Sequence, residues 1–243
     1  MRKILLLIPA LVMLAYSPAF AEDTLSNILQ GIKNRYGTSS GLSVPYTREV
    51  ITRSMSMLGS QAKGDLASGI IYFKPPHFLR LDQEKPASER IIANDNILWW
   101  YIPQKKEAHR YQTKDFGREL RLLSNIFRGL AEVKESFKVQ LQEKDEKGDY
   151  QVVLVPDPPW QEIDRIALTV SPEHEIRSVR IFNALGSVTR FNLGDFALEK
   201  TFEKGFFEFV APPGVNVVVE GENQPYNGGR TSDYKFICHT ILV

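Results

Sequence analysis

The 243-residue chain contains one cysteine, Cys238, and only four histidines, none of them spaced as H-x-H or H-x-x-x-H. A single cysteine excludes an internal disulfide framework and every zinc module that needs several cysteines, and the scattered histidines predict no metal site. The chain also has no excess of either charge, because 30 basic and 29 acidic residues leave a net charge of +1. We therefore expect no nucleic-acid partner, since a near-neutral protein has no general attraction for a polyanion.

Motifs for cofactors and catalysis are also scarce. No glycine-rich phosphate loop or nucleotide-binding fingerprint occurs, and we expect no cofactor. Residues 37–41 match the G-x-S-x-G pattern of a hydrolase nucleophile elbow, but that elbow follows a strand and precedes a helix. Here a helix is expected before the motif and a strand after it. We therefore expect a binding protein rather than an enzyme, with an esterase that uses Ser39 as the enzyme alternative.

The longest apolar run lies at the N-terminus and is typical of a secretion signal. Two basic residues precede an apolar stretch over residues 4–16, and Ala19-Phe20-Ala21 supplies small residues at both positions of an A-x-A cleavage site. The stretch is shorter than the roughly 20 residues that a membrane-spanning helix needs. We therefore expect residues 1–21 to be a cleaved signal peptide of an exported bacterial protein. Because no cysteine lies near the cleavage site, the product is expected to be soluble and without a lipid anchor.

The rest of the chain predicts one domain made mostly of strands. A helix comes first, with Asp23 or Thr24 as its N-cap and an end at the glycine-containing loop 37–41. Its apolar stripe consists of Leu25, Ile28, Leu29, Ile32 and Tyr36. Apolar runs between turn signals then predict an antiparallel arrangement of strands, with residues 143–149 as a solvated hairpin tip. The expected strands are 42–52, 70–73, 78–81, 91–92, 97–101, 150–155, 163–170, 176–182, 188–193 and 206–210.

Residues 115–131 interrupt this pattern with the spacing of an amphipathic helix. Its apolar stripe is formed by Phe116, Leu120, Leu123, Phe127 and Leu130, and arginines lie on the remaining face. Such a helix must bury its stripe against the sheet or against a ligand.

Large aromatic side chains are concentrated on the expected strands. Trp99, Trp100 and Tyr101 are consecutive, so their rings lie on both faces of one strand. Either a second layer covers one of these faces, or one face lines a cavity for an apolar ligand. Composition and spacing leave both interpretations open.

Three segments together resemble the bacterial outer-membrane lipoprotein carrier family, the LolA-like proteins. Residues 69–80 read Gly-Ile-Ile-Tyr-Phe-Lys-Pro-Pro-His-Phe-Leu-Arg, similar to the strand, proline turn and aromatic-containing strand of that family. Residues 94–103 read Asn-Asp-Asn-Ile-Leu-Trp-Trp-Tyr-Ile-Pro, similar to its turn and Leu-Trp-x-Tyr strand. Residues 207–215 read Phe-Glu-Phe-Val-Ala-Pro-Pro-Gly-Val, similar to its closing signature. The resemblance covers residues 22–219 and leaves 220–243 as a C-terminal tail.

The resemblance implies a mainly β protein with helices, in which an incomplete, strongly curved antiparallel β-barrel carries a helical lid over an apolar cavity. It also implies a periplasmic carrier that moves lipoproteins from the inner to the outer membrane of a Gram-negative bacterium. The implied partners are acylated lipoproteins, an inner-membrane ABC-type release complex and an outer-membrane lipoprotein acceptor. A shuttle of this kind is expected to be a monomer.

Carried over by position, the resemblance assigns nine candidates for the acyl-chain cavity and its lid. They are Phe78, Trp99, Tyr101, Leu120, Leu123, Phe127, Leu130, Phe207 and Phe209. Leu98 and Trp100 are expected on the strand face opposite Trp99 and Tyr101, and the sequence does not decide which face lines the cavity. The family's basic residue before the Pro-x-x-Phe segment, implicated in holding the lid closed, is Pro75 here, with Lys74 one position earlier.

Two further functions fit a domain of this kind. One is a carrier of another lipid, and the other is an envelope-stress sensor domain that binds a protein partner. Such sensors carry an additional C-terminal domain, whereas only 28 residues follow Val215 in this chain of 243. For these last residues, a poorly ordered end and an added edge strand are both open.

Overall fold

The computed structural model describes residues 19–57, 64–94, 96–112, 122, 125–130, 133–161 and 163–219, with side chains from residue 25 onward. Its α-helices are α1 (Ala19–Tyr36) and α2 (Arg53–Met57), and its short 3-10 helices are η1 (Pro103–Lys105) and η3 (Val133–Glu135). The strands are β1 (Leu42–Ile51), β2 (Asp65–Lys74), β3 (Phe78–Lys85), β4 (Glu89–Ala93), β5 (Ile97–Ile102), β6 (Glu107–Gln112), β7 (Phe137–Gln142), β8 (Tyr150–Pro156), β9 (Ile163–Val170), β10 (Ile176–Asn183), β11 (Val188–Leu193) and β12 (Asn216–Val219).

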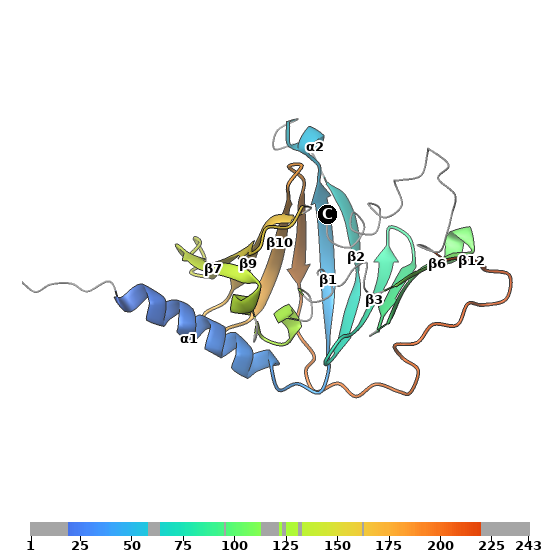
Figure 1. Cartoon of the computed structure of the whole chain (residues 1–243), viewed down its shortest axis with the longest axis horizontal. Coiled ribbons are helices and arrows are strands. Elements are labelled where there is room, and N and C mark those ends of the chain that lie inside the picture. Colours follow the sequence, from blue (N-terminus) through green and yellow to red (C-terminus); the bar gives the residue numbers. More distant parts are fainter. Residues whose placement is uncertain are drawn as a thin grey trace, which may run out of the picture.

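All of these strands belong to one sheet with the order β12-β6-β5-β4-β3-β2-β1-β11-β10-β9-β8-β7. Neighbouring strands are antiparallel, except that β12 pairs with β6 in parallel. The sheet curves strongly around β1 and does not close, because β7 and β12 form its two edges (Figure 1). This architecture confirms the predicted incomplete, curved β-barrel.

The inner, concave face of the sheet carries the hydrophobic core. Along β2 and β5 buried side chains alternate with more exposed ones, and β1 follows the same pattern except at the half-buried Arg48, as expected for strands that bury one face. α1 covers one end of the hollow (Figure 1), where Ile28, Ile32 and Tyr36 are buried. The Tyr36 hydroxyl accepts a hydrogen bond from the Ile176 backbone N–H at 3.1 Å, and Arg35 pairs with Glu175. These contacts fix the helix to the start of β10.

Most of the expected strands are present, and several elements differ from the expectation. Helix α1 begins at Ala19 rather than after a cap at Asp23 or Thr24, so that N-cap prediction is wrong. The expected strand at 206–210 is also wrong, because these residues form turns and irregular backbone. Strands β6 and β7 were not expected. β12 resolves the open question about residues 216–219 in favour of an added edge strand.

The expected hairpin tip at 143–149 joins β7 to β8. The Asp145 carboxylate accepts hydrogen bonds from the backbone N–H groups of Lys147 and Asp149, which closes the turn. Asp149 itself is buried and pairs with Arg177 at 3.2 Å, so this one residue of the tip is not solvated.

Two predicted segments lie partly or wholly outside the described residues. Residues 1–18 of the expected signal peptide and residues 220–243 of the tail are not described. Of the expected helix at 115–131, residues 122 and 125–130 are described, with helical backbone at 122 and 125–127. Within the described part of the chain, no helix has the length and apolarity needed to cross a membrane.

Candidate ligand-binding site

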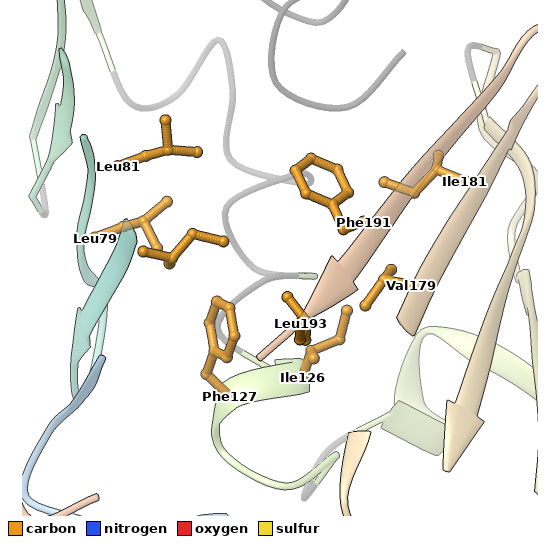
Figure 2. Close-up of a pocket in the computed structure, with 9 residues that line it drawn as sticks. Leu79, Leu81, Ile126, Phe127, Val179, Ile181, Phe191 and Leu193 are labelled. Atoms are coloured by element: carbon orange, nitrogen blue, oxygen red, sulfur yellow. The ribbon is translucent and has the colours of Figure 1, made fainter. Parts of the chain in front are cut away.

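An apolar cavity lies on the inner face of the sheet. Figure 2 shows Leu79 and Leu81 on one side, the side chains of β10 and β11 on the other, and Phe127 below them. The cavity has an empty volume of about 440 Å³, part of it open to solvent. Its nine lining residues are Ile71, Leu79, Leu81, Ile126, Phe127, Val179, Ile181, Phe191 and Leu193, all of them apolar. A cleft with this wholly apolar lining suits an apolar ligand.

The register of the strands decides which face of β5 turns inward. Ile71 and Leu81 are directly opposite one another on β2 and β3, Leu81 is opposite Ile91, and Ile91 is opposite Trp100. Directly paired residues share a face, so Trp100 lies on the face of the cavity-lining residues. Leu98 shares this inner face, and Trp99 and Tyr101 lie on the outer one.

Residues 125–130, here called the lid segment, are a short helical stretch followed by a turn, and they close the cavity at the α1 end. The Phe127 ring packs against Phe73 with 5.5 Å between ring centroids. Gly129 has a φ of +74°, and a side chain there would meet the Lys33 Cα atom at 2.5 Å. The lid segment therefore lies directly on the backbone of α1, at a position that only glycine fits.

Two of the four predicted lid residues, Phe127 and Leu130, lie at the cavity or in the core beside it. Phe127 lines the cavity, and Leu130 is buried in the core beside it. Leu120 and Leu123 lie outside the described residues. Ile126 lines the cavity and was not predicted, because the helical stripe read from the sequence passes through its neighbour Phe127.

The five predicted aromatic residues on or near strands are brought together, on the outer face of the sheet. The Phe209 ring lies 5.1 Å from both Trp99 and Tyr101, and the Phe207 ring lies 5.7 Å from Phe78. None of the five lines the cavity described above. Their ligand-binding role stays a prediction, and their position is separated from the cavity by the sheet.

Residues 194–215, here called the outer strap, carry Phe207 and Phe209 across this face between β11 and β12. The Phe206 carbonyl accepts a hydrogen bond from Arg80 at 3.1 Å, and the Arg80 guanidinium lies 4.3 Å above the Phe206 ring. Tyr72 packs edge-on against Phe206 at 5.1 Å. The outer strap is thus a second layer, which is one of the two interpretations that the aromatic strands left open.

The basic residue near the proline turn also lies apart from the lid segment. Lys74 ends β2, and its ammonium group lies 5.7 Å above the ring of Phe78 on the outer face. Pro75 and Pro76 follow in the turn to β3. The contacts found for the lid segment are with α1 at Gly129 and with β2 at Phe73.

Comparison with known proteins bears on what such a cavity is for. The model of the family described as "Outer membrane lipoprotein carrier protein LolA" matches residues 56–210, more than half of the chain. The chain belongs to the LolA family. An outer-membrane lipoprotein carrier protein from Francisella philomiragia is 22% identical over 221 residues, which cover 90% of this chain and 98% of that protein. One from Psychromonas ingrahamii is 24% identical over 228 residues and covers 89% and 98%.

The fold of this LolA-family chain is also found among solved structures. The crystal structure of an uncharacterised conserved protein from Thermus thermophilus superposes with a TM-score of 0.51. The sequence identity is 10%, and the match covers 81% of this chain and 99% of that one.

The G-x-S-x-G segment of the LolA-family chain has a structural role. Ser39 is buried, and its hydroxyl donates a hydrogen bond to the Gly41 carbonyl at 2.7 Å. The same oxygen accepts hydrogen bonds from the backbone N–H groups of Gly41 and Glu199. These bonds hold the loop between α1 and β1 against the outer strap. Within the described residues, no group of three His, Cys, Asp or Glu side chains is arranged to hold a metal ion.

Polar side chains occur on the inner face toward the end of the hollow away from the lid segment. Burial raises the pKa of Tyr46 to about 12, and burial lowers the pKa of the Arg48 guanidinium. The Glu89 carboxylate accepts a hydrogen bond from the Trp100 indole N–H at 2.9 Å. The LolA-family hollow is therefore apolar beside the lid segment and polar beyond it.

Proposed function

We propose that this protein is a periplasmic carrier that binds lipoprotein acyl chains in the inner cavity and moves lipoproteins from the inner to the outer membrane. The observation that carries the proposal is the wholly apolar lining of the cavity in a member of a lipoprotein carrier family. Burial of an acyl chain stabilises it by about 0.8 kcal/mol per CH₂ group, so an acylated lipoprotein does not cross water unaided.

The side chains of the cavity walls can hold such a chain through non-covalent apolar contacts alone. Leu79 and Leu81 face Val179, Ile181 and Phe191 across the hollow, so a chain between them contacts apolar atoms on both sides. Phe127 contacts the chain from the lid segment. Such contacts are non-directional, which permits reversible binding of acyl chains that differ in length.

The family relationship supports the proposed partners and direction of transfer. The relatives from Francisella and Psychromonas are named outer-membrane lipoprotein carrier proteins. We infer an inner-membrane ABC-type release complex as donor and an outer-membrane lipoprotein acceptor as recipient. The N-terminal signal-like segment supports export to the periplasm. The carrier needs neither a cofactor nor a catalytic residue.

Phe127 provides the test. We expect Phe127→Glu to weaken binding of a triacylated lipopeptide at least tenfold, because the cavity would then hold a desolvated carboxylate. Phe127→Trp, which keeps an apolar ring but fills part of the cavity, is also expected to weaken binding. Binding is measured by displacement of the neutral fluorescent probe N-phenyl-1-naphthylamine, and function by release of a lipoprotein from inner-membrane vesicles.

The matched control is Leu185→Glu, because Leu185 is 72% exposed in the turn between β10 and β11. This variant is expected to bind and release lipoprotein as the unchanged protein does. Unchanged binding in both folded Phe127 variants would contradict the proposed cavity function.

A further inference from the structure

We propose that Arg48, Tyr46 and Thr189 form a head-group subsite that binds the oxygen atoms at the polar end of an acyl chain lying in the cavity. This inference rests on the proposed function, since it assumes that the cavity takes the chain itself. The ligand chemistry is an oxygen acceptor next to a long apolar chain. The carbonyl oxygens of an acylated lipoprotein and the carboxylate oxygens of a free lipid both have this chemistry.

Strand register places the three side chains beside the cavity. Arg48 is directly opposite Phe191, which lines the cavity, and Thr189 is directly opposite Ile181, which also lines it. Tyr46 is opposite Leu193, a third lining residue, and its ring lies 5.8 Å from the Phe191 ring. Since opposite residues share a face, all three side chains belong to the inner face of the sheet.

The three residues are also close to one another. Tyr46 and Arg48 are two positions apart on β1, and Thr189 is the diagonal neighbour of Arg48 on β11. Diagonal neighbours on one face are about 7–8 Å apart, a span that a long arginine side chain covers. One head group at this place can therefore reach donors from both strands.

One polar atom of each of these three residues has no partner in the part of the chain that the structure describes. The Tyr46 hydroxyl, the Thr189 hydroxyl and the Arg48 Nε atom are buried and have no hydrogen-bond partner among the described residues. Tyr46 is 3% exposed and Thr189 is 1% exposed, so neither hydroxyl lies at the surface. A buried polar group without a partner is destabilising, and such groups are uncommon unless they serve a purpose.

The chemistry of the three groups selects one class of partner. A guanidinium only donates hydrogen bonds, and both hydroxyls can donate as well, so the subsite suits a group that accepts them. Glu89 and Asp65 act on Arg48 electrostatically, and none of the ion pairs found among the described residues includes Arg48. The Glu89 carboxylate is instead bonded to Trp100. The buried Nε–H group of Arg48 therefore remains available to a ligand oxygen.

The position along β1 fits the polarity of an acyl ligand. Val44 is on the apolar part of the inner face, beside the cavity-lining Ile71 on β2. Tyr46 and Arg48 follow at the next two inward positions, farther from the lid segment. A ligand with its chain tail toward Phe127 thus has its head at Arg48.

Three probes test the subsite in the full-length mature protein. Dodecanoate carries a carboxylate, a triacylated lipopeptide carries neutral carbonyl groups, and dodecyltrimethylammonium carries the same length of chain with no acceptor. Arg48→Met keeps the apolar stem and removes the donors. We expect this variant to bind dodecanoate or the lipopeptide about tenfold more weakly, and dodecyltrimethylammonium equally well or better. Tyr46→Phe and Thr189→Val, which each remove one hydroxyl, are expected to weaken the same probe to a smaller degree.

The matched control is Arg190→Met, because Arg190 lies on the outer face of β11, where it pairs with Glu49. It is expected to change no affinity. A loss for the lipopeptide assigns the subsite to ester or amide carbonyls, and a loss for dodecanoate alone assigns it to a free anionic lipid. Equal affinities of Arg48→Met and the unchanged protein for all probes would overturn the subsite while leaving the cavity function intact. Failure of the unchanged protein to bind any probe would instead overturn the proposed function and the subsite together.

Discussion

Tyr46 is the residue whose ionisation responds most clearly to its surroundings. Its hydroxyl is buried on the inner face of β1, and burial disfavours the charged phenolate. The pKa of Tyr46 is therefore raised to about 12, whereas the pKa of a tyrosine in an unfolded chain is about 10. The neighbouring charge of Arg48 opposes this shift without cancelling it.

The raised pKa predicts a loss of stability in alkaline solution. Between about pH 10 and about pH 12, the unfolded chain releases the Tyr46 proton and the folded protein keeps it. The free energy of unfolding should therefore be unaffected by this group below about pH 10 and should fall by about 2–3 kcal/mol through the window. Urea unfolding at a series of pH values measures the fall. In Tyr46→Phe the fall should be smaller by that amount, and an identical fall in both proteins would contradict the assignment.

The outer strap is the element whose role differs most from its appearance in the sequence. Its Phe-x-Phe pattern predicts a strand at 206–210, yet the rings of Phe206, Phe207 and Phe209 pack on side chains of β2, β3 and β5. The alternating phenylalanine side chains pack on the outer face of the sheet, and the backbone at 206–210 does not form a strand. The strap therefore shields aromatic residues that would otherwise be exposed to water.

The packing of the outer strap predicts how its substitutions behave. Phe207 is 6% exposed and contacts the rings of Phe78, Phe202 and Phe206. Phe207→Ala should lower the free energy of unfolding by about 3 kcal/mol through the lost ring and the void it leaves. Binding of N-phenyl-1-naphthylamine by the folded variant should stay unchanged. Val210→Ala, at an 86% exposed position of the same strap, is the control and should alter neither quantity. Weakened binding in folded Phe207→Ala would show that the outer aromatic residues contact the ligand.

The sequence predicted which segments form strands better than it predicted which face of each strand turns toward the cavity. Strands with continuous apolar runs, such as β8 and β9, were recognisable because both of their faces are largely buried. β6 was missed because its sequence, Glu-Ala-His-Arg-Tyr-Gln, is mostly polar and buries mainly Ala108 and Tyr111. The inward face of β5 could not be predicted, because it depends on a register through β2, β3 and β4 that no local pattern encodes. For the same reason, the cavity residues of β10 and β11 were not among the predicted site residues.

The whole molecule has its cavity between two parts of one sheet that meet at β1. β2 and β3 form one wall, β10 and β11 form the other, and the lid segment closes the end beside α1. The edges, β7 and β12, take no part in the lining of the cavity. A ligand in the cavity therefore contacts segments that are far apart in the sequence.

This arrangement predicts the pattern of amide hydrogen exchange on binding. A saturating triacylated lipopeptide should slow exchange in the lid segment and in β3 and β11, because the bound chain opposes local opening. Exchange in β12, an edge strand remote from the lining residues, should be unchanged and serves as the internal control. Protection concentrated in the outer strap would contradict this and would move the bound ligand to the outer face.

The path of the outer strap has a consequence for the size of cargo. It leaves the sheet at β11, crosses the convex surface over β2 to β5, and rejoins the sheet at β12 on the far edge. Rings such as Tyr72 and Phe206 pack together on this surface, so a change in the curvature of the sheet also changes the spacing of the contacts that the strap makes. The width of the hollow is then set partly by residues that never touch its contents. Natural variation along residues 194–215 can therefore adapt carriers that have the same cavity-lining residues to bulkier or slimmer lipoprotein cargo.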